Sequence, residues 1–325
     1  MKSDFKRIFA LLRNDMQEFN KNFERIMSSN IKLIDTIAKY VVKHKGKQFR
    51  PALLILASRA VGTPNQDTFT TAVVVELLHT ATLVHDDVVD EAELRRGFPT
   101  IHKVWKNKIA VLMGDYLLAK SLIAATEANS IEIMNTVATV AKRLIKGEIF
   151  EIQKSRNLDL NEYEYFTMIG DKTASLITAC CELGALTVDA SPADREILRV
   201  YGENIGLAFQ IKDDLLDYES NMGVLGKPVI NDLKEKKLTL PLIYSMHESK
   251  GNERRKVIKL IKNGATKKDI KFILSFINKY DGLDKTQSKA LELRNRAIES
   301  INKLPGSEAK NSLRALAEFV VNRKK

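Results

Sequence analysis

Cysteine is almost absent from this sequence of 325 residues, because its only two cysteines are the neighbours Cys180 and Cys181. Adjacent cysteines cannot cross-link separate loops, which excludes a disulfide framework and leads us to expect a reducing compartment, the cytoplasm. The N-terminal residues do not resemble a secretory signal, and the longest apolar stretch, residues 71–84, is interrupted by Glu76 and His79. We therefore expect no transmembrane segment.

The sequence also lacks the strict alternation of apolar and polar residues that is typical of half-buried strands. Apolar residues recur at spacings of three and four instead, which predicts helices almost throughout. Helix boundaries support this, since Gly62-Thr63-Pro64 should end one helix and Ser191-Pro192-Ala193-Asp194 should begin another. No Ser/Gly/Pro-rich linker, low-complexity tract or internal repeat divides the chain. We expect one all-α domain over residues 1–325.

Positive charge exceeds negative charge, and the formal net charge is +11. Such a balance favours polyanionic partners, which include nucleic acid, an anionic membrane surface and phosphorylated small molecules. Nothing besides net charge supports nucleic acid, because no recognised motif and no basic patch interleaved with aromatic residues is present. We expect phosphorylated substrates, no nucleic acid, and at most a transient membrane contact for product release.

Two acidic strings stand out, Asp86-Asp87-Val88-Val89-Asp90 and Asp213-Asp214-Leu215-Leu216-Asp217. Each follows an apolar helical run, and in each the first and last aspartates lie one turn apart on the same face. Like charges at that spacing repel, and the negative end of the helix dipole disfavours each carboxylate by roughly 0.3–1 kcal/mol. A bound divalent cation reverses the sign of these terms.

Magnesium is the ion that such carboxylates select in the absence of nearby His or Cys ligands. His85 and Asp86 resemble the dyad of metal-dependent hydrolases, but the other histidines offer no matching pattern. Mg²⁺ is usually held by one or two carboxylates together with substrate phosphates, so a phosphorylated ligand should complete the site. A solvated acidic helix end is the alternative for either string alone, and it is much less plausible for the pair.

Basic residues accompany the acidic strings. Arg95 and Arg96 follow the first string, and a guanidinium group binds phosphate oxygens with two parallel hydrogen bonds. His79 lies one heptad before Asp86, where its imidazole could donate to a phosphate, although a buried core histidine is the ordinary alternative. A basic residue taken singly is more often an ordinary solvated charge than part of a binding site. The further cations of interest are Lys47 and Arg50, Lys172 beside Thr173, Lys227, and Lys237.

As a set, these residues resemble the trans-isoprenyl diphosphate synthases, or polyprenyl synthetases. The resemblance runs in order through most of the chain: Gly46-Lys47-x-x-Arg50-Pro51, Glu76 to Asp90, Leu94-Arg95-Arg96-Gly97, Gly114-Asp115, Gly147-Glu148, Lys172-Thr173-Ala174, Gly206 to Asp217, Gly226-Lys227-Pro228, and Asp232-Leu233 leading to Thr239-Leu240-Pro241-Leu242. It implies an all-α helical bundle around a deep central cavity, usually as a homodimer. It also implies a reaction that joins isopentenyl diphosphate to an allylic diphosphate with release of pyrophosphate, helped by several Mg²⁺ ions.

The resemblance assigns roles residue by residue. It implies that Lys47, Arg50, His79 and Arg96 bind isopentenyl diphosphate, and that Arg95, Lys172, Thr173, Gln210, Lys227 and Lys237 hold the allylic diphosphate. Asp86, Asp90 and Asp213 would be the main metal ligands, with Asp87, Asp214 and Asp217 in support. The sequence departs from the family pattern at Glu151, where glutamine is common, and at Lys236, where glycine is common.

Product length is suggested by the helix that carries the first acidic string. Ala81 lies five residues before Asp86, or roughly 7.5 Å along the helix. Short-chain relatives often have a bulky aromatic there, whereas Ala81 and Thr82 leave the path open, so we expect a long-chain all-trans product such as a quinone side-chain precursor. A small residue that permits tight helix packing is the ordinary alternative for Ala81.

Three other functions stay open on the sequence alone. One is a shorter-chain synthase that makes geranylgeranyl or farnesyl diphosphate, and another is the noncatalytic partner subunit of a two-component synthase. A terpene cyclase is the third, but it typically replaces the second acidic motif and has no use for Lys47 and Arg50.

Overall fold

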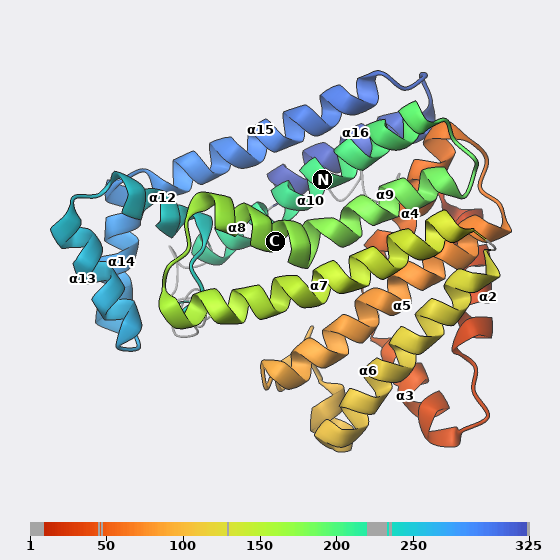
Figure 1. Cartoon of the computed structure of the whole chain (residues 1–325), viewed down its shortest axis with the longest axis horizontal. Coiled ribbons are helices and arrows are strands. Elements are labelled where there is room, and N and C mark those ends of the chain that lie inside the picture. Colours follow the sequence, from red (N-terminus) through yellow and green to blue (C-terminus); the bar gives the residue numbers. More distant parts are fainter. Residues whose placement is uncertain are drawn as a thin grey trace. The chain divides into compact units, whose positions relative to one another are not determined.

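The computed structural model describes residues 10–44, 46, 48–128, 130–219, 233 and 236–323. Nearly all of these residues are helical, which confirms the all-α prediction (Figure 1). Two residues with predicted roles, Lys47 and Lys227, lie outside the described part.

In chain order the elements are α2 (Arg13–Met27), α3 (Lys32–Lys43), α4 (Phe49–Val61), α5 (Gln66–Val89), β1 (Leu94–Arg95), β2 (Phe98–Pro99), α6 (Ile101–Glu127), α7 (Ile131–Asn157), α8 (Glu162–Ile169), the π-helix η1 (Gly170–Ala174), α9 (Ser175–Leu186), α10 (Pro192–Glu219), α12 (Leu240–Glu248), α13 (Gly251–Lys262), α14 (Lys267–Lys279), α15 (Gly282–Asn302) and α16 (Glu308–Asn322).

The chain divides into two compact units, each with its own core. Unit 1 comprises residues 1–142, 176–202 and 301–314, and unit 2 comprises residues 143–175, 203–300 and 315–325. The prediction of one domain over the whole chain stays a prediction, and each unit is described by itself below.

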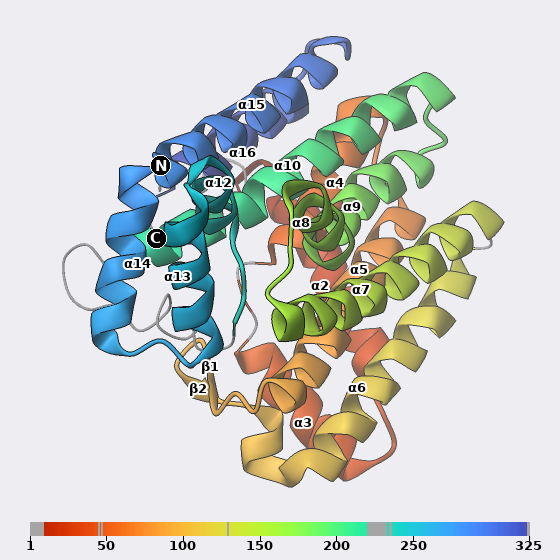
Figure 2. The same ribbon diagram turned by 60° about the vertical axis from the view of Figure 1, so that its left-hand side comes forward.

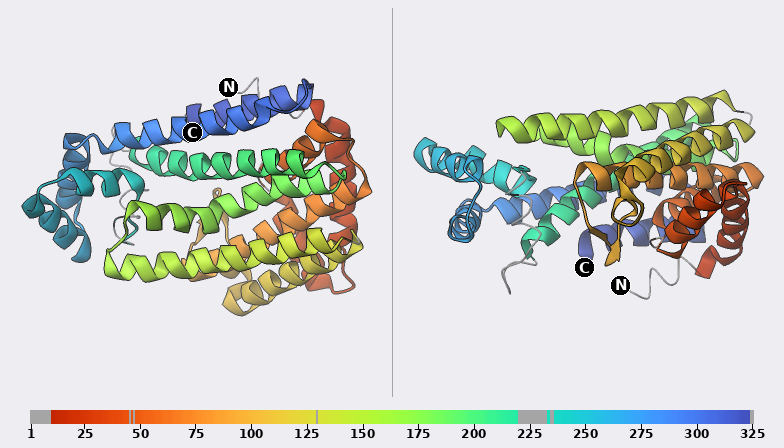
Figure 3. Two further views of the ribbon diagram at one scale, coloured as in Figure 1. Left: turned by 45° about the horizontal axis from the view of Figure 1, so that its top comes forward. Right: turned by 90° about the horizontal axis from the view of Figure 1, so that it is seen from below.

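In unit 1, α5 is the central helix. It packs along α6 and also contacts α4 and α2 (Figures 1 and 3). Its apolar residues face neighbours on several sides, so Leu77 and Leu78 are almost fully buried. Burial of each such side chain contributes about 1.5–3 kcal/mol. This packing fixes the direction of the helix that ends in the first acidic string.

Local sequence signals set the helix ends. The Asn65 side chain accepts the Thr68 N–H at 3.0 Å while the Thr68 hydroxyl accepts the Asn65 N–H at 3.1 Å, which starts α5. Ser191 caps α10 by accepting the Asp194 N–H at 3.1 Å, as its sequence predicts. The helix that begins at Pro192 then extends to the second acidic string.

A short hairpin and a π-helix interrupt the helices where no sequence pattern indicates them. The strands β1 and β2 pair antiparallel through Arg95 and Phe98 (Figure 2). Arg96 and Gly97, which form the turn, have φ angles of 55° and 83°. Two positive φ angles match the right-handed twist of such a tight hairpin.

In unit 2, α12 packs against α8 and α14, and α8 continues directly into η1. Gly282, the first residue of α15, lets this helix approach α12 closely, because a Cβ atom on Gly282 would lie 2.3 Å from the Pro241 carbonyl oxygen. These contacts support α8 and, through it, the π-helix η1 that carries Lys172.

Within the described chain, α6 is long and apolar enough to cross a membrane by length and composition. Buried residues make up 39% of its most apolar stretch, and a core helix can pass the same test. By sequence alone the longest apolar stretch is residues 71–84, which belong to α5, and the absence of a transmembrane segment stays a prediction. Cys180 and Cys181 are both free and buried, as expected for a chain without disulfide bonds.

Candidate active site

In the first acidic string one carboxylate is buried and the other two are more accessible. Asp87 is 5% exposed, and its Oδ1 accepts a hydrogen bond of 2.7 Å from Arg95 Nε. Burial raises the pKa of Asp87, and the Arg95 hydrogen bond offsets this only in part. Asp86 is half-buried and Asp90, the C-cap of α5, is exposed. The spacing of four residues therefore leaves Asp86 and Asp90 as the more accessible pair.

Arg50 and His79 form a polar pair between α4 and α5. Arg50 Nη1 lies 2.9 Å from His79 Nε2, and because arginine can only donate, the imidazole nitrogen is the acceptor. Burial lowers the pKa of His79 well below its usual range, and the charges of Arg50, Arg96 and Arg95 lower it further. His79 is therefore neutral and fixes the guanidinium of Arg50, and its Nδ1 atom is the one that can donate to a phosphate.

The β1–β2 turn brings Arg96 to the same place. A Cβ atom on Gly46 would lie 2.2 Å from Arg96 Nη1, so the guanidinium rests directly on the glycine backbone. The charge of Arg96 also acts on His79, which shows that Arg96 lies near the Arg50–His79 pair. Unit 1 thus gathers Arg50, His79, Arg95 and Arg96, all of which the sequence assigned to diphosphate binding.

His85 serves a different purpose from its neighbour Asp86. Its Nε2 atom lies 3.3 Å from Asp115 Oδ1 and 3.2 Å from the Val111 carbonyl oxygen, both on α6. Gly114 makes room for the ring, because a Cβ atom there would lie 2.2 Å from Nε2. The imidazole therefore joins α5 to α6, in agreement with the rejection of a hydrolase dyad.

In the second acidic string, Asp214 is held inside unit 2. Its Oδ2 accepts a hydrogen bond of 2.6 Å from the Tyr165 hydroxyl, and its Oδ1 accepts one of 2.9 Å from Gln210 Nε2. Gln210 in turn accepts from the Thr173 hydroxyl at 2.8 Å. Burial and the Asp214 charge raise the pKa of Tyr165 well above its usual range, so the hydroxyl remains a donor. This network links α8, η1 and α10.

Lys172 projects from the π-helix η1. Its Nζ lies 2.8 Å from Glu148 Oε2 and also bonds to Glu151. Burial alone would lower the pKa of Lys172, but the two carboxylates raise it above the usual value, so the ammonium stays charged. Gly147 allows this approach, since a Cβ atom there would lie 2.7 Å from the Lys172 backbone nitrogen. The extra residue of a π-helix frequently occurs at functional sites.

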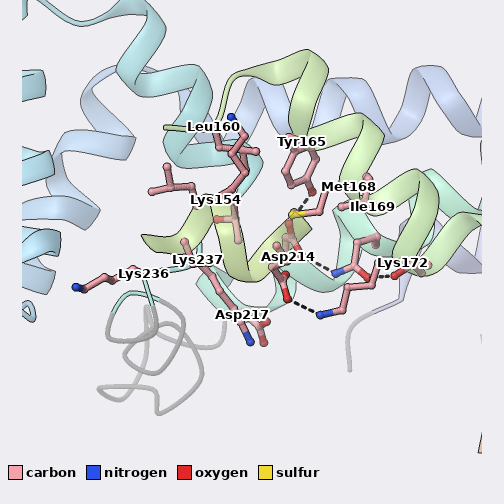
Figure 4. A pocket seen from close by; sticks show the side chains of 16 residues that line it. Lys154, Leu160, Tyr165, Met168, Ile169, Lys172, Asp214, Asp217, Lys236 and Lys237 are labelled. Carbon is pink, nitrogen blue, oxygen red and sulfur yellow. Dashed lines mark hydrogen bonds and ion pairs between the residues drawn. The ribbon is translucent and has the colours of Figure 1, made fainter. Parts of the chain in front are cut away.

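A cavity of about 180 Å³ lies among these groups in unit 2 (Figure 4). Lys172, Asp214 and Asp217 face it together, whereas Lys236 points away from them. Leu160, Met168, Ile169 and Leu238 form the apolar part of its lining. The polar part combines carboxylates, ammonium groups, hydroxyls and a carboxamide: Glu151, Lys154, Lys172, Thr173, Gln210, Asp214, Asp217, Lys237 and Thr239. Lys172, Thr173, Gln210, Asp217 and Lys237, all predicted from sequence, therefore share one small polar pocket.

Asp213 has a basic partner from the end of the chain. Arg323 Nη2 lies 2.6 Å from Asp213 Oδ1 and donates to the Phe209 carbonyl oxygen at 3.0 Å. The guanidinium also lies 4.1 Å from the centre of the Phe209 ring, a cation–π contact. The pKa of Arg323 is lowered by burial, although the Asp213 charge opposes the shift.

The structure thus brings the predicted residues together in two groups, one in each unit. Sequence reasoning missed Tyr165 and Arg323, and it included Glu148 in the family pattern without giving it a role. Ala81, which we associated with product length, is 2% exposed, and the Thr82 hydroxyl donates to the His79 carbonyl oxygen at 2.9 Å. Whether they border a path for a growing chain stays a prediction.

The donor set of both groups fits a hard divalent cation. Accessible carboxylates come in pairs one turn apart, and the partners of Asp87 and Asp213 are cations, Arg95 and Arg323. Among the described residues, no three His, Cys, Asp or Glu side chains form a ready-made metal cluster. The assignment of Asp86, Asp90 and Asp213 as the main metal ligands stays a prediction, and their oxygen atoms are of the kind that Mg²⁺ prefers.

Comparison with known proteins shows that residues 31–277 match the polyprenyl synthetase family model. The octaprenyl diphosphate synthase of Haemophilus influenzae is 33% identical over 95% of this chain and 94% of its own length. A second relative is component 2 of the heptaprenyl diphosphate synthase of Bacillus subtilis, which is 33% identical over 98% of this chain and 91% of its own length.

Solved structures agree with these relatives. A decaprenyl diphosphate synthase from Rhodobacter capsulatus has a TM-score of 0.93 and 34% identity, with 99% of each chain covered. A polyprenyl synthase from Caulobacter crescentus has a TM-score of 0.89 and 33% identity, with 99% of this chain and 98% of that chain covered. The latter was solved in complex with calcium and isoprenyl diphosphate.

Proposed function

Because the chain belongs to the polyprenyl synthetase family, and is therefore a prenyltransferase, we propose that it is a magnesium-dependent long-chain trans-polyprenyl diphosphate synthase. Its reaction would condense isopentenyl diphosphate, head to tail, with an allylic diphosphate. The observation that carries the proposal is that each acidic motif has its own group of cations, Arg50, Arg95 and Arg96 in unit 1 and Lys172 and Lys237 in unit 2. Two diphosphate substrates need two such groups.

In unit 1, Arg50, His79 and Arg96 form the proposed site for isopentenyl diphosphate, together with Lys47. Neutral His79 accepts a hydrogen bond from Arg50 Nη1 and so holds the guanidinium group in place. Preorganised donors of this kind lose little conformational freedom when a phosphate arrives.

In unit 2, Lys172, Thr173, Gln210 and Lys237 form the proposed site for the allylic diphosphate, with Arg95 and Lys227 contributing from elsewhere in the chain. Lys172 keeps its charge because Glu148 and Glu151 raise its pKa. Those carboxylates hold Lys172 until a diphosphate competes for the ammonium group. The cavity of about 180 Å³ is of a size for a diphosphate group.

Mg²⁺, bound by Asp86, Asp90 and Asp213, would supply positive charge that neutralises the diphosphate oxygens. Around it, Lys172, Lys237 and Arg95 would stabilise the charge that develops on the departing pyrophosphate as the allylic C–O bond breaks. Arg50 and Arg96 would hold isopentenyl diphosphate so that its double bond attacks the allylic cation. Loss of a proton to the released pyrophosphate would then regenerate an allylic product that can react again. Apolar walls would exclude water, which would otherwise trap the cation.

A long-chain product is supported by the relatives named octaprenyl and decaprenyl synthases and by the small residue Ala81. A homodimer is supported by the exposed apolar side chains of α6, since Leu112 and Ile123 are 54% and 62% exposed. A second copy that covers this face would remove them from water. Light scattering of the purified protein measures the dimer directly.

The proposed function is tested with the purified protein, labelled isopentenyl diphosphate, farnesyl diphosphate and Mg²⁺, followed by sizing of the dephosphorylated products. We expect long all-trans polyprenols, and no product after chelation of the metal. Products no longer than geranylgeraniol would establish a short-chain synthase instead, and a cyclic hydrocarbon would establish a terpene cyclase.

A noncatalytic partner subunit would give no product alone at any Mg²⁺ concentration. That alternative is kept because one relative is a component of a two-component synthase. Both acidic motifs are complete in this sequence, which favours a catalytic subunit over a noncatalytic one.

A further inference from the structure

The positive charge of the chain is concentrated in one short segment, residues 250–280. This segment contains ten basic and two acidic residues, a net charge of +8 out of the +11 of the whole chain. It consists of α13 and α14, joined by a short turn, and Figure 3 shows them as the teal and blue pair of short helices. The active-site residues described above lie on other elements.

On α13 the basic side chains form one stripe. Arg255, Lys259 and Lys262 are spaced by four and three residues, which places them on the same helix face, and all three are exposed. The opposite face is buried through Val257 and Ile261. None of the three cations makes a side-chain hydrogen bond or ion pair within the described part of the chain.

On α14 the solvent face has the same character. Lys268, Lys271 and Lys279 are exposed on one side, while Ile270, Ile273 and Phe276 are buried on the other. Lys256 of α13 places its Nζ 4.1 Å from the centre of the Phe272 ring of α14, which connects the two helices. We call the exposed basic residues of the two helices the basic hairpin.

The two acidic residues of the segment do not neutralise this surface. Glu253 is engaged by Lys279 at 2.7 Å and by the Tyr280 hydroxyl at 2.6 Å. Asp269 accepts from the Thr266 backbone and hydroxyl at the start of α14. Both carboxylates therefore stabilise the hairpin itself. They offset the charges of Lys279 and Lys268 in part, and the stripe of Arg255, Lys259 and Lys262 on α13 has no carboxylate partner in the described part of the chain.

We propose that the basic hairpin is an electrostatic docking surface for an anionic lipid membrane. Clusters of four to eight Lys and Arg residues on an amphipathic helix are typical of surfaces that bind anionic lipids. No large apolar side chain of α13 or α14 is among the exposed ones in the described chain, so the contact depends on charge without insertion. The hairpin is therefore expected to bind reversibly and to release at high salt.

The choice of a membrane among polyanions rests on the proposed function, because a long polyprenyl tail is insoluble in water and must pass to a lipid phase. Nucleic acid fits the surface less well. Single strands bind by stacking on exposed aromatic rings, whereas the hairpin directs Phe276 inward and covers Phe272 with Lys256.

The test is sedimentation of the full-length protein with vesicles of phosphatidylcholine, alone or mixed with phosphatidylglycerol, in the absence of substrates. We expect binding to the anionic vesicles only, with release at about 1 M salt, where charges are screened over a few ångströms. Each Lys or Arg close to an anionic surface strengthens binding roughly fivefold. The triple variant Arg255→Gln/Lys259→Gln/Lys262→Gln should therefore bind roughly a hundredfold more weakly.

A matched control is offered by α3, where Lys32, Lys39 and Lys43 are also exposed on one helix face. Their replacement by glutamine changes the net charge by the same amount and should leave vesicle binding within about twofold of the parent chain. A second hairpin variant, Lys268→Gln/Lys271→Gln, guards against local misfolding of α13 and should weaken binding in the same direction. Thermal unfolding checks that each variant is folded.

Several results would overturn the proposal. One is equal binding to neutral and anionic vesicles, and another is an equal loss of binding in the α3 control. A third comes from a parallel measurement of RNA binding, if the triple hairpin variant loses binding to RNA but keeps its binding to anionic vesicles. Since no turnover is measured, a chain that binds vesicles through the hairpin yet makes no prenyl product would keep the docking surface and refute only the proposed function.

Discussion

Tyr165 is fully buried, and its hydroxyl donates to one carboxylate oxygen of Asp214 while Gln210 donates to the other. Buried polar groups are costly unless they are hydrogen-bonded, and a carboxylate inside a protein needs several donors. Asp214 is thus oriented by its neighbours before any substrate arrives. Tyr165 is a positioning residue for the second acidic motif.

Replacement of Tyr165 by phenylalanine removes the hydroxyl that donates to Asp214 Oδ2. We expect the free energy of unfolding to fall by about 1.5–3 kcal/mol, because the lost hydrogen bond involves a buried charge. We also expect product formation to slow roughly tenfold or more, with a higher Mg²⁺ concentration needed for half-maximal rate. Initial rates over a Mg²⁺ titration measure the second effect.

Tyr244→Phe is the matched control, since the Tyr244 hydroxyl also donates to a carboxylate, that of exposed Glu162, at 2.7 Å. This substitution should lower the free energy of unfolding by less than about 1 kcal/mol and leave the Mg²⁺ dependence of the reaction rate unchanged. If both variants showed the same profile, Tyr165 would have a structural role only.

His79 gives the stability of the protein a dependence on pH. Its pKa in the folded state lies well below the ordinary 6.5, because of burial and the charges of Arg50, Arg96 and Arg95. Below pH 6.5 the unfolded chain therefore binds a proton that the folded chain does not, and stability falls as the pH decreases towards the folded pKa. Well above pH 6.5 neither state binds this proton, so the contribution of His79 to stability no longer changes with pH.

His79→Gln should remove this contribution, so its denaturation midpoint should change less between pH 7 and pH 5 than that of the parent chain. The expected difference in slope is about 1.4 kcal/mol per pH unit within the window. Identical slopes for the two proteins would show that His79 does not stay neutral in the folded state.

At the scale of the elements, local signals predict helices well and predict their interruptions poorly. The cap at Ser191 and the stop at Gly62 are encoded within a few residues, so α10 and the end of α4 follow from the sequence. The β1–β2 hairpin is too short to show alternation, and its positive φ angle at Arg96 is imposed by the tight turn. Neither the family resemblance nor the spacing of apolar residues indicates this hairpin.

The π-helix η1 could not be predicted because it depends on contact with another helix. Gly147 of α7 presses against the backbone of Lys172, and no pattern within Gly170–Ala174 reveals that approach. For the same reason the sequence identified Asp214 and Asp213 but not their partners, which lie 49 and 110 residues away. Residue types with strong chemistry are visible in a sequence, whereas long-range partners require the fold.

The helix α5 provides a prediction about product length. If the growing tail passes Ala81, the series Ala81→Val, Ala81→Leu and Ala81→Phe should shorten the product progressively, because each larger side chain blocks the path earlier. Chromatography of the dephosphorylated products measures the lengths. Since Ala81 is 2% exposed, overpacking should also cost about 1–3 kcal/mol of stability.

An unchanged product length together with a lower unfolding temperature would contradict this account. It would mean that Ala81 serves tight packing of α5, the ordinary role of a small buried residue, and that the tail runs elsewhere.

At the scale of the whole molecule, charge is distributed by function. Acidic motifs with local cations occur in each of the two compact units, while most of the excess positive charge lies in residues 250–280, which contain neither motif. The net charge of +11 thus combines two kinds of anion recognition, of diphosphates in the active site and of a lipid surface on α13 and α14. The first is specific in geometry and the second depends on charge alone.

The central claim is that binding of Mg²⁺ together with the allylic diphosphate requires both acidic motifs. The most direct measurement is calorimetric binding of Mg²⁺ with an unreactive allylic analogue, farnesyl thiolodiphosphate, to the parent chain, Asp86→Asn, Asp213→Asn and the double variant. Joint binding predicts that each single change removes most of the Mg²⁺-dependent affinity and that the double change adds little, a coupling of about 1–3 kcal/mol. Independent, additive losses, or binding that survives chelation, would contradict it.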